Sequence, residues 1–183
     1  MATATRITLE EFLANPDPHF FDFHELHDGE VVIVPPPSLA HQEMQKRLER
    51  LLDALLAPTY TAFNEFYYLL PTESRRADIA AIPSSKLQDS DRAKRVYQGS
   101  PDLVIEILSP SNEYLDVDHI RSLCLKDGTL EFWVINPDLQ TVTVFGPENT
   151  VTIYTAEASI PLDRFVPKQT LRVADIFPQT IDR

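Results

Sequence analysis

Glycine, cysteine and tryptophan are scarce in this chain of 183 residues, which contains four, one and one of them. Four glycines and no Gly-rich phosphate loop argue against a Rossmann or Walker nucleotide site. The single cysteine, Cys124, excludes an internal disulfide and fits a reducing cytosol. No apolar run approaches the roughly 20 residues that cross a bilayer, and the first residues, MATATRITLEEF, do not resemble a secretory signal. We therefore expect a cytoplasmic protein with no membrane partner.

Positive charge is also in short supply, because 16 Lys and Arg residues stand against 28 Asp and Glu residues, for a net charge of -12. Proteins that grip phosphate backbones non-specifically usually carry a basic surface. If the ligand is nucleic acid, the basic residues must be concentrated locally, or a divalent cation must offset the repulsion. A local basic arm for DNA is conceivable in the polar loop at 83–100, although a solvated loop is the simpler interpretation. Its basic residues are Lys86, Arg92, Lys94 and Arg95.

The length fits one domain over residues 1–183, and the balance of 43% hydrophobic and 24% charged residues is that of a globular protein. Thr8 and Glu11 have capping-box spacing, which predicts a short helix. Asp28-Gly29 separates FHEL from EVVIV, which predicts a hairpin. Ser38 is a good N-cap for a long helix whose leucines recur at helical spacing until Pro58.

The next segments predict strands at Phe63–Leu70, Ala77–Ile82 and Pro101–Leu108, and the last of these is almost continuously apolar. Ser109-Pro110-Ser111 supplies a turn and a cap for a second helix that ends before Gly128, and Glu131–Asn136 reads as a further strand. The remaining segments, including TVTVFG and VTIY, alternate like short antiparallel strands. The helix between the third and fourth strands suits a crossover between parallel neighbours. We expect an α/β fold with a mixed β-sheet flanked by helices and antiparallel hairpins at its edges.

Two carboxylates interrupt the apolar strands of this prediction. Glu106 lies within Leu103–Leu108, and Asp78 lies within Ala77–Ile82. An isolated ionised carboxylate is costly in a buried strand, and two on neighbouring strands repel each other unless a cation or a proton compensates. Magnesium typically uses one or two carboxylates together with water and substrate phosphates, so the pair predicts a divalent-metal site. The alternative is that each carboxylate is solvated at a strand end or pairs with Arg75 or Arg76.

Several motifs resemble the Uma-two family of restriction-endonuclease-like proteins, a branch of the PD-(D/E)xK nuclease superfamily. They are ELHDGEVV (Glu25–Val32), PPPSLAHQ (Pro35–Gln42), RADIA (Arg76–Ala80), PDLVIEILSPSN (Pro101–Asn112) and GTLEFWVINP (Gly128–Pro137). The resemblance implies a restriction-endonuclease-like fold, a homodimer, DNA as substrate and Mg²⁺ or Mn²⁺ as cofactor. It makes Asp78 and Glu106 the metal-binding and catalytic acids and Glu25 a further acid of the site. His41 matches a family position of unclear role.

The chain departs from this family at the lysine that normally accompanies the acids. The usual place in the superfamily motif, two residues after the glutamate, is Leu108 here. The family instead tends to carry the lysine four residues after an aspartate that matches Asp116, and that position is Ile120. Arg121 is adjacent, but one helical step rotates a side chain by about 100 degrees, and Lys126 also lies off that face.

Two functions therefore remain open. One is a metal-dependent endonuclease weakened by loss of the lysine, and the other is a catalytically degenerate nuclease fold that binds nucleic acid or a protein. Zinc at His24 and His27 is the weaker interpretation, because their spacing is one residue short of HExxH and they lie in a hairpin. Cys124 is most simply a small buried hydrophobe, and Trp133 reads as strand core.

Overall fold

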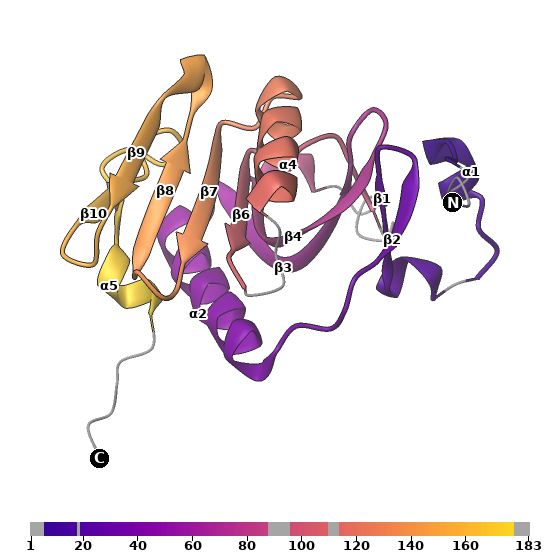
Figure 1. The fold of residues 1–183 in the computed structure, drawn as a ribbon. Helices are drawn as coiled ribbons and strands as arrows, with labels where there is room; N and C mark the ends of the chain where they lie inside the picture. Colours follow the sequence, from indigo (N-terminus) through magenta and orange to yellow (C-terminus); the bar gives the residue numbers. More distant parts are fainter. Residues whose placement is uncertain (1–5, 18, 88–95, 110–113, 178–183) are drawn as a thin grey trace.

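A mixed sheet forms the centre of the computed structural model, which describes residues 6–17, 19–87, 96–109 and 114–177 (Figure 1). In the described part of the chain its strands run in the order β2-β1-β4-β6-β7-β8-β9, and β3 pairs with both β4 and β5. The strands are β1 (His24–His27), β2 (Glu30–Ile33), β3 (Tyr60–Leu69), β4 (Ser74–Pro83), β5 (Tyr97–Gln98), β6 (Leu103–Ile107), β7 (Glu131–Asn136), β8 (Thr141–Phe145) and β9 (Val151–Tyr154).

Two long helices cover opposite faces of this sheet (Figure 1). Helix α2 (Leu39–Leu56) starts at Ser38, whose side chain accepts a hydrogen bond from the backbone of His41. Its buried stripe, which includes Leu48 and Leu52, packs on the face that carries Ile79 and Ile105. Helix α4 (Tyr114–Lys126) packs on the other face through Val117, Ile120 and Cys124, against Ala80, Val104 and Phe132.

The predicted topology is confirmed in its main features. β6 and β7 are parallel and are connected through α4, and the antiparallel hairpins β1–β2 and β8–β9 end the sheet. In the first hairpin, Gly29 has a φ of +82°, and a Cβ there would lie 3.2 Å from the carbonyl oxygen of Ile7. Helix α1 (Leu9–Leu13) has the predicted capping box between Thr8 and Glu11. None of the helices in the described residues is long and apolar enough to cross a membrane.

The ends of some elements differ from the sequence prediction. β4 begins earlier than predicted, at Ser74, where polar side chains are buried by ion pairs rather than exposed. β3 begins earlier as well, at Tyr60, which pairs with Pro83 at the end of β4. Beyond β9, a small second sheet of β10 (Ser159–Pro161) and β11 (Thr170–Arg172), followed by α5 (Val173–Ile176), packs on the α2 side of the core. The predicted cap at Pro110 and Ser111 lies outside the described residues.

The sheet forks along β4. One edge of β4 pairs with β3 from Ser74 to Pro83, so β1 and β6 both pair with its other edge. β1 reaches that edge at Ser74, and β6 pairs with it from Ile79 to Ala81. Residues 75–78 therefore lie where the two neighbouring strands separate. Ala77 and Ala80, three residues apart, pack in the same cluster beneath α4, so the two-residue alternation of β4 is interrupted between them.

Candidate active site at the fork of the sheet

A cavity of about 850 Å³ opens at this fork. Its walls come from the β1–β2 hairpin and the segment after it, the start of α2, the fork itself, the end of β6 and one face of α4. Both charge signs line it. The ionisable side chains are Glu25, Glu65, Asp78, Glu106, Asp116, His27, His41, Arg75 and Arg76.

Asp78 connects three elements through its carboxylate. Oδ2 accepts a hydrogen bond of 2.7 Å from the backbone N–H of Ile107, where β4 and β6 begin to separate. Oδ1 lies 2.7 Å from Nε2 of His41 and accepts a hydrogen bond of 2.8 Å from Nε2 of Gln45. Gln45 also donates to Glu65. The hydrogen bond with Asp78 raises the pKa of His41. The orientation of Asp78 is therefore fixed from both β6 and α2.

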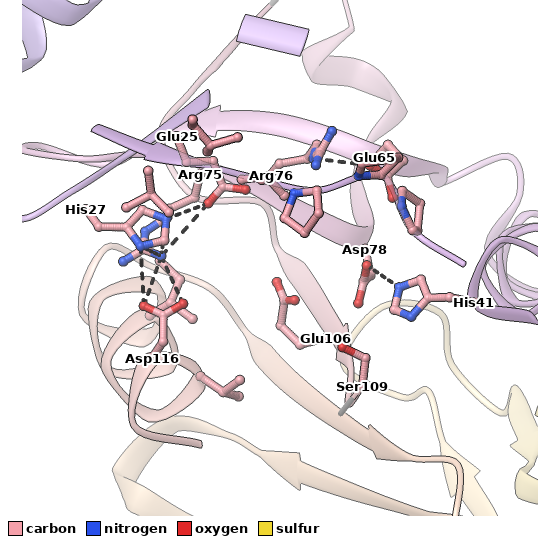
Figure 2. Close-up of a pocket in the computed structure, with 18 of the residues that line it drawn as sticks. Glu25, His27, His41, Glu65, Arg75, Arg76, Asp78, Glu106, Ser109 and Asp116 are labelled. Atoms are coloured by element: carbon pink, nitrogen blue, oxygen red, sulfur yellow. Dashed lines mark hydrogen bonds and ion pairs between the residues drawn. The ribbon is translucent and has the colours of Figure 1, made fainter. Parts of the chain in front are cut away.

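Glu106 lies beside Asp78 in the sheet. The pairing of β4 with β6 ends at Ile79 and Ile105, and Asp78 and Glu106 are the next residues on the two strands. Figure 2 shows both side chains in the same cavity, with His41 beyond Asp78. Burial raises the pKa of Glu106 well above its ordinary value, and the charges of Asp78 and Glu25 raise it further. Within the described part of the chain, no hydrogen bond or ion pair reaches its carboxyl group.

The donors at the fork fit a hard divalent cation. Magnesium takes oxygen ligands and commonly binds through only one or two protein carboxylates, with water completing its shell. Asp78 and Glu106 are such a pair, and a carboxylate has about four lone-pair sites, so Asp78 retains acceptor capacity beside its hydrogen bonds. The described residues contain no group of three or more His, Cys, Asp or Glu side chains placed to hold a metal ion.

A charged network occupies the wall on the β1 side of the cavity (Figure 2). Nε2 of His27 lies 2.7 Å from Oε2 of Glu25. Nη1 of Arg75 lies 2.8 Å from the same His27 nitrogen and donates to Oδ1 of Asp116 at 3.1 Å. Nε of Arg75 donates to Oε2 of the buried Glu73 at 2.7 Å. The guanidinium group therefore connects β1, β4 and α4.

Comparisons with known proteins identify the family and the fold of the chain. The model of the Uma2 family, described as "Putative restriction endonuclease", matches residues 9–174. The chain belongs to the Uma2 family. A crystal structure described as a putative nuclease belonging to DUF820, from Anabaena variabilis, superposes with a TM-score of 0.82 at 28% identity, covering 93% of this chain and 97% of that one. No curated protein matches the chain significantly. The family and the fold are therefore nuclease-like.

At both lysine positions of the Uma2 resemblance the chain is apolar. Leu108 packs against the cluster beneath α4, and Ile120, only 4% exposed, lines the cavity. Arg121 pairs with Asp118 at 2.6 Å, and its guanidinium carbon lies 4.7 Å from the centre of the Phe145 ring. Neither Arg121 nor Lys126 is among the described residues that line the cavity.

His27 and Arg75 were not predicted as components of the site. The sequence suggested His27 only as part of the weaker zinc interpretation, and Arg75 only as a partner for the two acids. Among the described contacts, Arg75 pairs with neither Asp78 nor Glu106. Arg76 pairs with Glu65 at 3.1 Å. A faint signal was available, because Arg75 stands three residues before Asp78, just ahead of the strand predicted at Ala77–Ile82.

The remaining sequence interpretations concern residues away from the acids. His24 stacks on Phe20, Cys124 is buried with its sulfur 3.3 Å from the Tyr68 hydroxyl, and Trp133 is fully buried. Lys86, the described member of the expected basic arm, pairs with Asp102 at 3.0 Å. The other three, Arg92, Lys94 and Arg95, lie outside the described residues.

Proposed function

We propose that the chain is a divalent-metal-dependent endonuclease that hydrolyses phosphodiester bonds of DNA. The observation that carries this proposal is that two carboxylates, Asp78 and Glu106, stand next to the last β4–β6 pair and line one cavity. We assign both as metal ligands for Mg²⁺ or Mn²⁺. A bound ion supplies a Lewis acid that makes hydroxide available near neutral pH and offsets the charge of the phosphate.

The protein's own groups divide the work at this site. Asp78 presents a carboxylate already oriented by Ile107, His41 and Gln45, so little reorganisation accompanies ligand binding. Glu106 has a raised pKa, so its proton competes with a cation for the same oxygens. Glu25 is the third catalytic acid of the proposal. Its charge acts on Glu106, and its carboxylate holds His27 against the cavity.

DNA is the substrate that best accounts for the combination of acids and arginines in this cavity. Arg75 and Arg76 both line it beside five acids, so the cavity offers guanidinium groups to a phosphate in a chain whose net charge is -12. A divalent cation held by Asp78 and Glu106 would offset the remaining repulsion.

We also propose a two-fold homodimer. Homodimers are the commonest assembly of soluble chains, and exposed edge strands favour pairing with another chain. In the described sheet β9 is a terminal strand, and its Val151 and Ile153 are 56% and 65% exposed.

The second candidate function is a degenerate nuclease fold that binds nucleic acid or a protein without cleaving it. The observation in its favour is the apolar pair at the expected lysine positions, Leu108 and Ile120. Both candidates retain the acids, so metal binding alone does not distinguish them, whereas cleavage of DNA does.

The test combines plasmid cleavage with the shift in melting temperature on adding Mn²⁺. The wild-type chain should nick plasmid DNA and gain stability with Mn²⁺, because an ion that binds only the folded state raises the melting temperature. Asp78→Asn and Glu106→Gln should lose both effects. Asp138→Asn, a change at an exposed acid in the turn after β7, should keep both. Cleavage that survives Glu106→Gln would remove the proposed mechanism, and metal-dependent DNA binding without cleavage would establish the second candidate.

A further inference from the structure

Asp116 of α4 has a partner that does not belong to its own helix. Residues four apart on a helix lie on the same face, so a lysine at position 120 would stand beside Asp116. Position 120 is isoleucine, and the cation beside Asp116 is Arg75 of β4. Its Nη1 lies 3.1 Å and 3.4 Å from the two carboxylate oxygens of Asp116.

Arg75 is placed to act on the cavity as well as to hold the wall together. It is 3% exposed, and it lines the same cavity as Asp78 and Glu106. Two of its nitrogens are engaged by Glu73, His27 and Asp116. The third, Nη2, is buried and has no hydrogen-bond partner among the residues that the structure describes. A buried donor without a partner is unfavourable, and among the described contacts Nη2 is the one nitrogen of this guanidinium group whose hydrogen bonds are still unmade.

Arg76 fits this role less well, although it also lines the cavity. Its guanidinium group is held by Glu65 and by the Tyr67 hydroxyl.

We infer that Arg75 supplies, from strand β4, the positive charge at the scissile phosphate that position 120 of helix α4 does not provide. This inference rests on the proposed nuclease function. Nη2 is the donor available to a phosphate oxygen, because a guanidinium group presents several N–H donors in a planar arrangement that matches phosphate. Glu73 and Asp116 hold the rest of the group in place. A purely structural role would instead use Arg75 only to join β1, β4 and α4.

Moving the positive charge from position 75 to position 120 distinguishes a role at the phosphate from a purely structural one. The variants are Arg75→Met, Arg75→Lys, Ile120→Lys and the combination of Arg75→Met with Ile120→Lys, with Arg121→Met as the matched arginine control outside the cavity. Steady-state cleavage of a short DNA duplex with Mn²⁺ gives kcat and KM. Arg75→Met should lower kcat by about 10²–10³, comparable to losing one donor at a developing charge, with a smaller change in KM. The combination should recover at least about tenfold of that loss, and Arg75→Lys should fall between, while Arg121→Met should match the wild type.

A second measurement follows binding without turnover. Fluorescence anisotropy of a labelled duplex without metal, repeated over a range of salt concentrations, reports how many protein charges meet phosphates. Removing one phosphate contact should reduce the salt slope by about one, and restoring the charge at position 120 should return it. Circular dichroism and the melting temperature of each variant report folding. If Arg75→Met does not fold, kcat and the salt slope of Arg75→Lys and Ile120→Lys are compared with those of the wild type instead.

The possible results separate a failure of the role assigned to Arg75 from a failure of the proposed nuclease function. The role of Arg75 is overturned if Arg75→Met cleaves with the kcat of the wild type. It is also overturned if the folded double variant is as slow as Arg75→Met alone. Either result leaves the proposed nuclease function intact. Absence of wild-type cleavage with every divalent ion overturns the nuclease, and the salt slope then decides whether Arg75 meets phosphate. An unchanged slope in Arg75→Met overturns the inference.

Discussion

Nε2 of His41, in the first turn of α2, lies 2.7 Å from Oδ1 of Asp78, at the fork of β4. The contact explains why a histidine stands at the start of this helix. Ser38 fixes the first turn through the backbone N–H of His41, and the imidazole then fixes the carboxylate. Its own pKa rises in return, because the hydrogen bond and the charges of Asp78 and Glu65 favour the protonated ring.

We predict that His41→Ala weakens Mn²⁺ binding by about 10–100-fold, the usual cost of removing a group that orients a metal ligand. Isothermal titration of the metal-free protein measures the affinity. His19→Ala, at an exposed histidine paired with Asp22, should bind Mn²⁺ as the wild type does. Equal affinities in His41→Ala and the wild type would contradict an orienting role for His41.

Much of the fold was predictable because its signals are local. The apolar run around Glu106, the leucine stripe of α2 and the hairpin at Asp28-Gly29 each determine an element without reference to the rest of the chain. The two acids were visible for the same reason, since a charge within an apolar strand is conspicuous. The function proposed for them depends on a shared cation, which local pattern cannot supply.

The fork and the charged wall were not predictable, because they depend on distant pairings. Leu26 of β1 meets β4 at Ser74 alone, and this single pairing decides which residues line the gap. Arg75 and Arg76 are equivalent in the sequence, yet one contacts Asp116 and the other Glu65. Alternation along a strand places the two on opposite faces, but the sequence does not say which of those faces meets α4.

The raised pKa of Glu106 predicts how the metal-free protein responds to pH. A folded-state pKa above the ordinary 4.5 means that the folded chain holds this proton more tightly than the unfolded chain. The stabilisation is fully present below about 4.5 and is lost as pH rises through the raised value. Glu106→Gln should therefore reduce the fall in the free energy of unfolding over this window, measured by urea denaturation with EDTA present. The control is Glu157→Gln, at an exposed site. Identical pH dependence in Glu106→Gln and the wild type would show that Glu106 is ionised in the folded chain.

The exposed edge of β9 predicts the assembly. Light scattering should give twice the 20.8 kDa mass of the chain, falling to the monomer at low concentration. Ile153→Lys should favour the monomer, because charged residues on an edge strand oppose pairing. Leu139→Lys, at a residue that is 70% exposed in the turn before β8, should leave the mass unchanged. A wild-type monomer mass across a wide concentration range would rule out the dimer. A dimer that survives Ile153→Lys would exclude the β9 edge as its interface.

Replacing Ile120 by lysine in the otherwise unchanged chain tests how much positive charge the site still lacks. A lysine there would lie beside Asp116 and extend along the apolar wall, with its ammonium group directed into the cavity beside Glu106. If position 120 were the only source of positive charge, Ile120→Lys should raise kcat by about 10²–10³. Because Arg75 already provides a cation, we expect a smaller gain of about tenfold, measured with Mn²⁺ on the duplex used above. Ile120→Met keeps the wall apolar and should not change kcat. A gain near the upper figure would mean that Arg75 contributes little, and no gain in a folded variant would mean that α4 does not direct residue 120 at the phosphate.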